Sequence, residues 1–206
     1  MRKLVNFHHR HILHLYKNNE ELYFSYYLDE LIEHKIIKSY TYEQETFTLS
    51  EDVVFSYTKI TELKTKTKVE NKTKSLLKPC TYTPDFVITF SPKRGVWGQP
   101  DLFPTFVVIK GKKAYVDVKG MFAGRTNSTQ YTFPLKQKWL YKDYGIYTNK
   151  IVPDKLFEST FTPKKVIDTE VYKRDIPNRN IKMGDTKLKY KITTIKEWLK
   201  TINKSI

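Results

Sequence analysis

The sequence predicts an α/β fold in which helices flank a central mixed β-sheet and a basic C-terminal extension follows. An amphipathic helical pattern follows a basic leader. Apolar strand-like runs come next, and a further helix and strand follow them. At 206 residues the chain is long enough for one domain core with additions. We predict a basic leader at 1–17, a core at 18–152 and a basic extension at 153–206.

The first predicted helix runs from Asn18 to about Lys38. Its apolar residues recur at a helical spacing, namely Phe24, Leu28, Leu31, Ile32 and Ile36. Asn18, followed three residues later by Glu21, matches a capping box, in which the two side chains satisfy free N–H groups of the first turn. A strand is expected near 42–49.

A lysine- and threonine-rich segment occupies 59–78. It holds seven Lys and two Glu, and such a polar stretch cannot contribute much to a core. We therefore expect an exposed hairpin or a mobile loop that carries positive charge.

The remaining elements follow from apolar runs and turn residues. A strand is predicted at 86–90, then a hairpin with arms 105–110 and 113–119 joined through Gly111. Thr132 is expected to cap a helix at 133–144, with Pro134 in its first turn, where proline is tolerated. A strand at 146–152 and a short amphipathic helix at 194–202 complete the prediction.

The formal net charge of +15 and the pI of about 9.6 favour a polyanionic partner, most often nucleic acid. No apolar run approaches the roughly 20 residues of a membrane-spanning helix, and His and Arg interrupt the N-terminal segment where a signal peptide is apolar. The lone Cys80 cannot form an internal disulfide. We expect a soluble cytoplasmic protein with DNA, and no membrane, as its partner.

Two predicted strands carry the groups that a metal-dependent phosphodiesterase needs. Asp85 precedes the run Phe86 to Phe90, and Asp117 lies near the end of the run from 113. In a hairpin the two acids can lie side by side at the sheet edge, and the two-residue period of a strand places Lys119 on the face of Asp117. Two carboxylates and an amine can hold a hard divalent cation and position a water beside a phosphate.

Pro84-Asp85 and Asp117-x-Lys119, between a first helix and a later helix and strand, resemble the PD-(D/E)xK nuclease superfamily. The strings YTPDFVI, YVDVKG and TQYTFPLKQK look most like those of small phage-encoded endonucleases and Holliday-junction-resolvase-like nucleases in it. The resemblance implies a restriction-endonuclease-like core and a DNA endonuclease of phage DNA processing or recombination, in the cytoplasm of an infected bacterium. Resolvase relatives act as dimers, so a homodimer is possible.

The resemblance also implies site residues. Asp85, Asp117 and the Val118 carbonyl would be ligands of Mg²⁺ or Mn²⁺, and Lys119 would orient or deprotonate the water or stabilise the phosphorane. A further acid commonly comes from the first helix of such folds. Glu20 and Glu21 are the candidates, and we prefer Glu21 because it continues the buried stripe of the helix.

Residues of the helix at 133–144 are expected to reach the DNA. We assign Lys136 to the scissile phosphate because it neighbours apolar positions, and Gln137 with Tyr141 forms a Gln-x-x-x-Tyr spacing found in one recombination-nuclease branch. The other predicted DNA contacts are Lys138, Arg125, Lys66 and Lys68.

Three alternatives remain open from the sequence. The cluster His8, His9, His11 and His14 lacks the Cys or acidic ligands of a familiar zinc site and fits a basic leader or a plain terminus better. The second alternative is a non-catalytic nucleic-acid-binding protein that uses basic patches and aromatic faces. TPDF followed by a strand that ends in an acid-x-Lys also resembles transposition-type end-cleaving nucleases.

Overall fold

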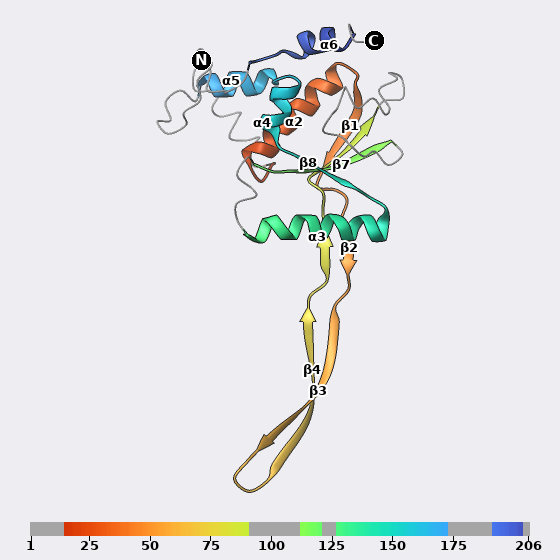
Figure 1. Ribbon diagram of the computed structural model, residues 1–206, viewed down its shortest axis with the longest axis vertical. Helices are drawn as coiled ribbons and strands as arrows, with labels where there is room; N and C mark the ends of the chain where they lie inside the picture. The colour runs from red at the N-terminus through yellow and green to blue at the C-terminus, as the bar shows by residue number, and fades with distance from the viewer. Residues whose placement is uncertain (1–14, 91–111, 121–126, 173–190, 204–206) are drawn as a thin grey trace.

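The computed structural model describes residues 15–90, 112–120, 127–172 and 191–203. A four-stranded mixed sheet forms its centre, in the order β1-β6-β7-β8 (Figure 1). Its strands are β1 (Ile37–Tyr42), β6 (Phe86–Phe90), β7 (Lys113–Val118) and β8 (Thr148–Ile151). β1, β6 and β7 pair antiparallel, and β7 and β8 pair parallel. The predicted α/β class with a mixed central sheet is confirmed.

The first helix, α2 (Asn19–Glu33), begins where predicted and ends earlier. Asn18 accepts a hydrogen bond from the backbone N–H of Glu21 at 2.8 Å, as the capping-box pattern predicts. Lys35 adopts a left-handed backbone conformation, with φ of 59°, and closes the helix. Ile36 therefore lies beyond the helix, and the strand predicted near 42–49 is replaced by β1 and β2 (Phe47–Ser50).

The lysine- and threonine-rich segment is an exposed hairpin, as one of the two predicted alternatives states. Its strands are β3 (Val53–Glu62) and β4 (Thr67–Leu77), so the hairpin starts six residues before the predicted segment. It projects from the body of the protein as a long two-stranded arm (Figure 1). The short pair β2 and β5 (Cys80–Tyr82) lies at its base.

The parallel pair β7 and β8 is connected through α3 (Asn127–Tyr144), since parallel neighbours need a crossover. The helix starts before the predicted residue 133, and Pro134 lies inside it instead of in its first turn. Thr132 is therefore within the helix and not its cap, because a proline can remove one helical hydrogen bond without ending the helix. The predicted arm 105–110 lies outside the described residues.

Side chains that alternate along the strands pack into two clusters, one on each face of the sheet. On one face Phe86, Ile88 and Val116 contact α2. On the other face Val87 and Tyr115 contact Leu140 and other residues near α3. Since successive side chains of a strand point to opposite faces, α2 and α3 cover opposite sides of the sheet (Figure 1).

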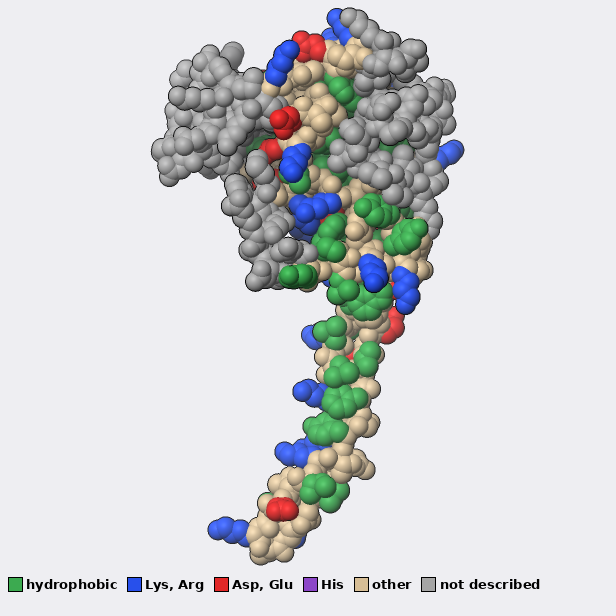
Figure 2. All heavy atoms as spheres, in the orientation of Figure 1, with side chains coloured by type: hydrophobic (Ala, Val, Ile, Leu, Met, Phe, Trp, Pro, Cys, Tyr) green, Lys and Arg blue, Asp and Glu red, His purple; other side chains and the backbone are tan. Residues whose placement is uncertain are grey.

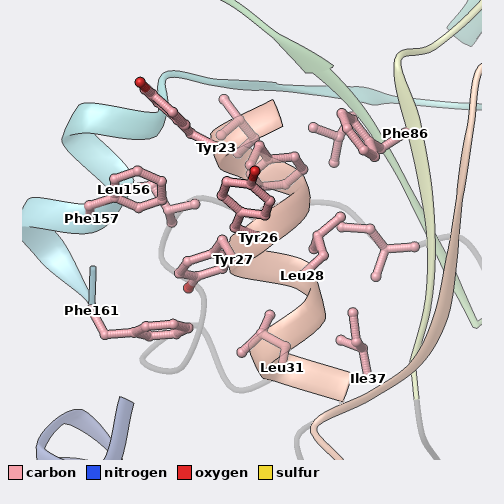
Figure 3. Packing of buried hydrophobic residues seen from close by; sticks show 14 of the residues in the cluster. Tyr23, Tyr26, Tyr27, Leu28, Leu31, Ile37, Phe86, Leu156, Phe157 and Phe161 are labelled. Carbon is pink, nitrogen blue, oxygen red and sulfur yellow. The ribbon is translucent and has the colours of Figure 1, made fainter. Parts of the chain in front are cut away.

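The helices after residue 153 pack into the same core as α2. They are α4 (Pro153–Ser159), α5 (Lys164–Tyr172) and α6 (Ile195–Asn203). The ring of Tyr27 stacks on Phe161 at 4.3 Å between centroids and on Phe157 at 5.8 Å (Figure 3), and Trp198 contacts Phe161. The described part of the predicted extension is thus integrated with the first helix. None of the described helices is long and apolar enough to cross a membrane.

Candidate functional site

The structure brings Asp85 and Asp117 together, as the strand pattern predicts. Phe86 pairs with Val116 across the antiparallel strands β6 and β7, so the preceding Asp85 lies opposite Asp117. The Asp85 Oδ2 atom accepts a hydrogen bond from the backbone N–H of Val118 at 2.7 Å. The two acids are close enough for the charge of Asp117 to raise the pKa of Asp85. Both residues are buried.

Burial dominates the electrostatics of this pair. Burial, followed by the hydrogen bond and the charge of Asp117, raises the pKa of Asp85, while the Val118 N–H and the Lys119 ammonium lower it in part. Two adjacent buried carboxyl groups cannot both ionise at low cost unless a cation or a shared proton compensates them. A bound cation or a shared proton would therefore stabilise this pair.

Lys119 supplies the amine of the predicted constellation. Its Nζ donates to Asp117 Oδ1 at 2.8 Å and lies 5.7 Å from the ring centroid of Phe133 in α3. The backbone N–H of Lys119 donates to the Ile151 carbonyl, which continues the β7–β8 pairing past the end of β7. Asp117 and Lys119 therefore share the α3 face of the sheet, as the two-residue strand period predicts.

Tyr82 is a neighbour of this pair that we did not predict from the sequence. Burial and the nearby charge of Asp117 raise its pKa, and its buried hydroxyl has no hydrogen-bond partner among the described residues. Tyr82 belongs to the cluster on the α3 face. It lies in the YTPDFVI string three residues before Asp85, which is the only signal that could have found it.

Glu21, the preferred helix acid, lies on the α2 side in a hydrogen-bonded network. Its carboxylate accepts from the Asn18 amide at 2.6 Å, from the Tyr42 hydroxyl at 2.6 Å and from the Lys17 backbone N–H at 3.0 Å. Tyr42 belongs to β1 and packs with the α2 cluster. The buried Glu21 thus ties the start of the helix to the sheet.

Glu20, the other candidate, lies near the end of β7. A Cβ atom added to Gly120 would come 3.2 Å from Glu20 Oε1, so the Glu20 carboxylate lies against the residue that follows Lys119. A larger residue at position 120 would require this carboxylate to move. Of the two candidate acids, Glu20 is therefore the one with a direct neighbour at the residue after Lys119.

Lys17, which we predicted to belong to the leader, is a further charged neighbour of the candidate site. Its ammonium pairs with Glu43, which chiefly raises its pKa, and the charges of Asp85 and Glu21 raise it further. The backbone N–H of Glu43 donates to the Asp85 carbonyl at 3.0 Å. This ion pair therefore borders the site on the side of Asp85.

The predicted DNA contacts are dispersed. Lys136 Nζ donates to the Thr81 carbonyl at 3.3 Å, four residues before Asp85, whereas the amide of Gln137 donates to the Thr148 carbonyl at 2.5 Å and links α3 to β8. Lys138 is exposed on α3. Lys66 and Lys68 lie in the turn and in β4 of the projecting hairpin, and Arg125 lies outside the described residues.

The donor set suits one Mg²⁺ ion with water ligands. Among the described residues, no group of three or more His, Cys, Asp or Glu side chains is placed to hold a metal, so the predicted set of Glu21, Asp85 and Asp117 is not assembled. Mg²⁺ commonly uses one or two carboxylates and completes its shell with waters and substrate phosphates. Asp85 and Asp117 fit that pattern. The four histidines considered for zinc lie outside the described residues.

Comparison with known proteins gives no match, whether with family models, curated proteins or solved structures.

Proposed function

We propose that this protein is a Mg²⁺-dependent endonuclease that hydrolyses phosphodiester bonds in DNA. The observation that carries the proposal is the convergence of Asp85, Asp117 and Lys119 at the ends of two adjacent strands. Buried acids beside a lysine are costly to a fold, so a fold that retains them has a use for them.

The two carboxylates would hold the metal. Asp85 is positioned by the Val118 N–H and Asp117 by the Lys119 ammonium, so neither needs to reorganise when a cation arrives. When bound, Mg²⁺ acidifies a water molecule and neutralises charge on the phosphate. Asp85 would then be ionised, because the cation replaces the proton that burial favours.

Lys119 would act on the attacking water or on the phosphate. Its ammonium is held between Asp117 and the Phe133 ring and is largely shielded from solvent. It can donate a hydrogen bond to a non-bridging phosphate oxygen and stabilise the charge that develops in the transition state. It can also orient the water for in-line attack.

The order of the elements supports the resemblance to the PD-(D/E)xK superfamily. α2, β1, β6 and β7 precede the crossover helix α3 and the parallel strand β8, which is the order of helix, strands, helix and strand on which the resemblance rests. Within that proposal, a restriction-endonuclease-like core presents Asp85, Asp117 and Lys119 on the face that α3 covers.

DNA is the proposed substrate because of charge. The net charge of +15 favours a polyanion over a small phosphorylated metabolite. Lys136 and Lys138 lie on α3, the helix that covers the face of the acidic pair. A nucleic-acid backbone that reaches the ends of β6 and β7 beside α3 would place a phosphate near Asp117 and Lys119.

The test is a cleavage assay of the purified protein on supercoiled, single-stranded circular and four-way-junction DNA, with Mg²⁺, Mn²⁺ or EDTA. We expect cleavage of at least one substrate with metal and none in EDTA. Asp117→Asn and Lys119→Met should lose cleavage, whereas Lys155→Met, an exposed lysine of α4, should retain it. Cleavage by the two site variants at the wild-type rate refutes the site assignment. Tight DNA binding without cleavage of any substrate supports the non-catalytic alternative instead.

A further inference from the structure

The β3–β4 hairpin has two chemically different faces. Residues directly opposite each other on paired strands lie on the same face. Phe55 lies opposite Lys74 and Tyr57 lies opposite Lys72. The same face continues toward the hairpin tip with the pairs Lys59–Glu70 and Thr61–Lys68. It therefore gathers two aromatic rings, four lysines and a single acid.

The opposite face carries almost no charge. Its cross-strand pairs are Val54–Ser75, Ser56–Thr73, Thr58–Asn71 and Ile60–Val69, followed by Glu62–Thr67 near the tip. The lysines of the paired strands are thus segregated onto one side of the hairpin. In the space-filling view, lysine side chains project outward along the hairpin beside a row of hydrophobic side chains (Figure 2).

The basic face is ordered by its own contacts. Phe55 and Tyr57 stack with 5.6 Å between ring centroids and are 40% and 39% exposed. Lys68 and Lys72 flank Glu70 at 2.6 and 3.2 Å, and the acid is outnumbered by the surrounding lysines. The face therefore presents net positive charge along the hairpin.

We propose that this face of the hairpin binds the phosphate backbone of duplex DNA beyond the cleavage site, a proposal that rests on the proposed nuclease function. A strand of this length extends about 33 Å, close to one turn of B-DNA at about 34 Å. Side chains on one face recur about every 7 Å, and the duplex carries one negative charge per about 1.7 Å of its axis. The hairpin is thus an arm that extends the DNA footprint by about one turn.

Charge complementarity selects this occupant. A second copy of the chain carries the same net charge of +15 and the same basic face, so two hairpins would repel each other. A duplex offers phosphates of both strands along the length of the arm. The two aromatic rings lie directly opposite Lys72 and Lys74, where they can support the aliphatic stems of these lysines.

The experiment measures DNA binding in EDTA by fluorescence anisotropy, so that cleavage does not interfere. The test variant replaces the basic face with glutamine at four positions, Lys59, Lys68, Lys72 and Lys74. A charge-matched control replaces four exposed lysines of the helical body with glutamine, at Lys155, Lys164, Lys196 and Lys200. A second control changes the neutral face with three substitutions, Val54→Thr, Ile60→Thr and Val69→Thr.

We expect the test variant to bind a duplex of about 30 base pairs at least about tenfold more weakly than the wild type. Its salt dependence should flatten by about 3 to 4 in the log–log slope, because each lost phosphate contact removes about 0.9. For a duplex of about 10 base pairs, which spans one turn, the loss should be much smaller. The two controls should bind the longer duplex more tightly than the test variant, and the neutral-face control should equal the wild type.

Equal binding by the test variant and the wild type overturns the proposal, and so does an equal loss in the charge-matched control. If the wild type binds single-stranded DNA more tightly than duplex DNA and the test variant loses this preference, the choice of duplex DNA as the occupant is wrong. All these outcomes are read from binding without metal. They remain distinct from failure of the nuclease proposal, which is read as absence of metal-dependent cleavage.

Discussion

Asp85 Oδ2 accepts a hydrogen bond from the backbone N–H of Val118 at 2.7 Å, across two antiparallel strands. Val118 lies between Asp117 and Lys119, so this bond sets the position of one acid relative to both other members of the candidate site. Charge-assisted bonds from backbone N–H groups are among the stronger hydrogen bonds in proteins. The backbone therefore contributes directly to the spacing of the two carboxylates.

Asp85→Asn should abolish metal-dependent cleavage and stabilise the metal-free protein at alkaline pH. Burial and the neighbouring Asp117 raise the pKa of Asp85. The unfolded carboxyl ionises first, at a pH near 4, so the wild type loses stability as the pH rises from there through the raised folded pKa. Asparagine stays neutral and can still accept the Val118 hydrogen bond. At about pH 9 its free energy of unfolding should exceed that of the wild type by at least about 1 kcal/mol, since one pKa unit is worth about 1.4 kcal/mol.

Urea unfolding in EDTA at about pH 4 and pH 9 measures this difference. Near pH 4 both proteins carry a neutral side chain at this position, so the gain should nearly vanish. A variant that is less stable than the wild type at about pH 9 contradicts the electrostatic account.

Mg²⁺ should raise the melting temperature of the wild type at neutral pH and raise it less near pH 5. Protons compete with the metal for Asp85, whose pKa is raised, because a ligand carboxyl must ionise to bind. At a metal concentration about 100 times the dissociation constant, the gain in unfolding free energy is about 2.7 kcal/mol. Thermal unfolding with Mg²⁺ or EDTA measures the shift. Asp117→Asn should lose the response, and Asp168→Asn, an exposed acid of α5, should keep it; an equal response in both variants argues against the site.

The parts of the fold and site that depend on neighbours in sequence could be predicted from the sequence. Asn18 accepts a hydrogen bond from the backbone N–H of Glu21, three residues later, and Lys119 donates a hydrogen bond to Asp117, two residues earlier. Helix and strand periodicity determine both relationships directly. An exposed hairpin was one of the two structures predicted for 59–78, because the composition of this segment excludes a core position.

The parts that depend on distant contacts could not be predicted. The hydroxyl of Tyr42, 21 residues from Glu21, binds the Glu21 carboxylate, and a helical pattern alone cannot show this partner. Tyr27 and Phe161 stack although more than 130 residues separate them. Because local sequence patterns do not show such a contact, we predicted an extension where the C-terminal helices pack into the core. The early end of α2 rests on a left-handed Lys35, a conformation that lysine seldom adopts.

Glu20→Gln should lower cleavage about 10- to 100-fold, the usual effect of losing a group that supports a metal site through its outer shell. Glu21→Gln should instead lower the free energy of unfolding by about 1 kcal/mol or more, because it weakens the buried network with Asn18 and Tyr42. Cleavage rates and urea unfolding of both variants separate the two roles. If Glu21→Gln is as stable as the wild type and inactive, the original preference for Glu21 is correct.

Gly120→Ala provides an independent test of the Glu20 position. The added methyl would come 3.2 Å from Glu20 Oε1, and this flexible carboxylate must move to make room. Cleavage should fall with little change in stability, because the end of a long side chain can shift at low cost. In the Glu20→Gln background the same substitution should have a smaller effect on the rate, as expected for two residues that act through one contact.

Substitutions of Gln137 and of its neighbour Lys136 should affect different properties: the first should lower stability and the second should weaken DNA binding. The Gln137 amide donates to the Thr148 carbonyl at 2.5 Å, so Gln137→Ala leaves a carbonyl of β8 without this partner and should cost about 1–3 kcal/mol of stability. The ammonium of Lys136 contacts the Thr81 carbonyl at 3.3 Å at an exposed position. Lys136→Gln should therefore keep stability, weaken DNA binding and reduce the salt slope by about 1. Urea unfolding and anisotropy on the same duplex measure both quantities. If Gln137→Ala is fully stable and binds DNA more weakly, its amide serves DNA recognition instead of joining α3 to β8.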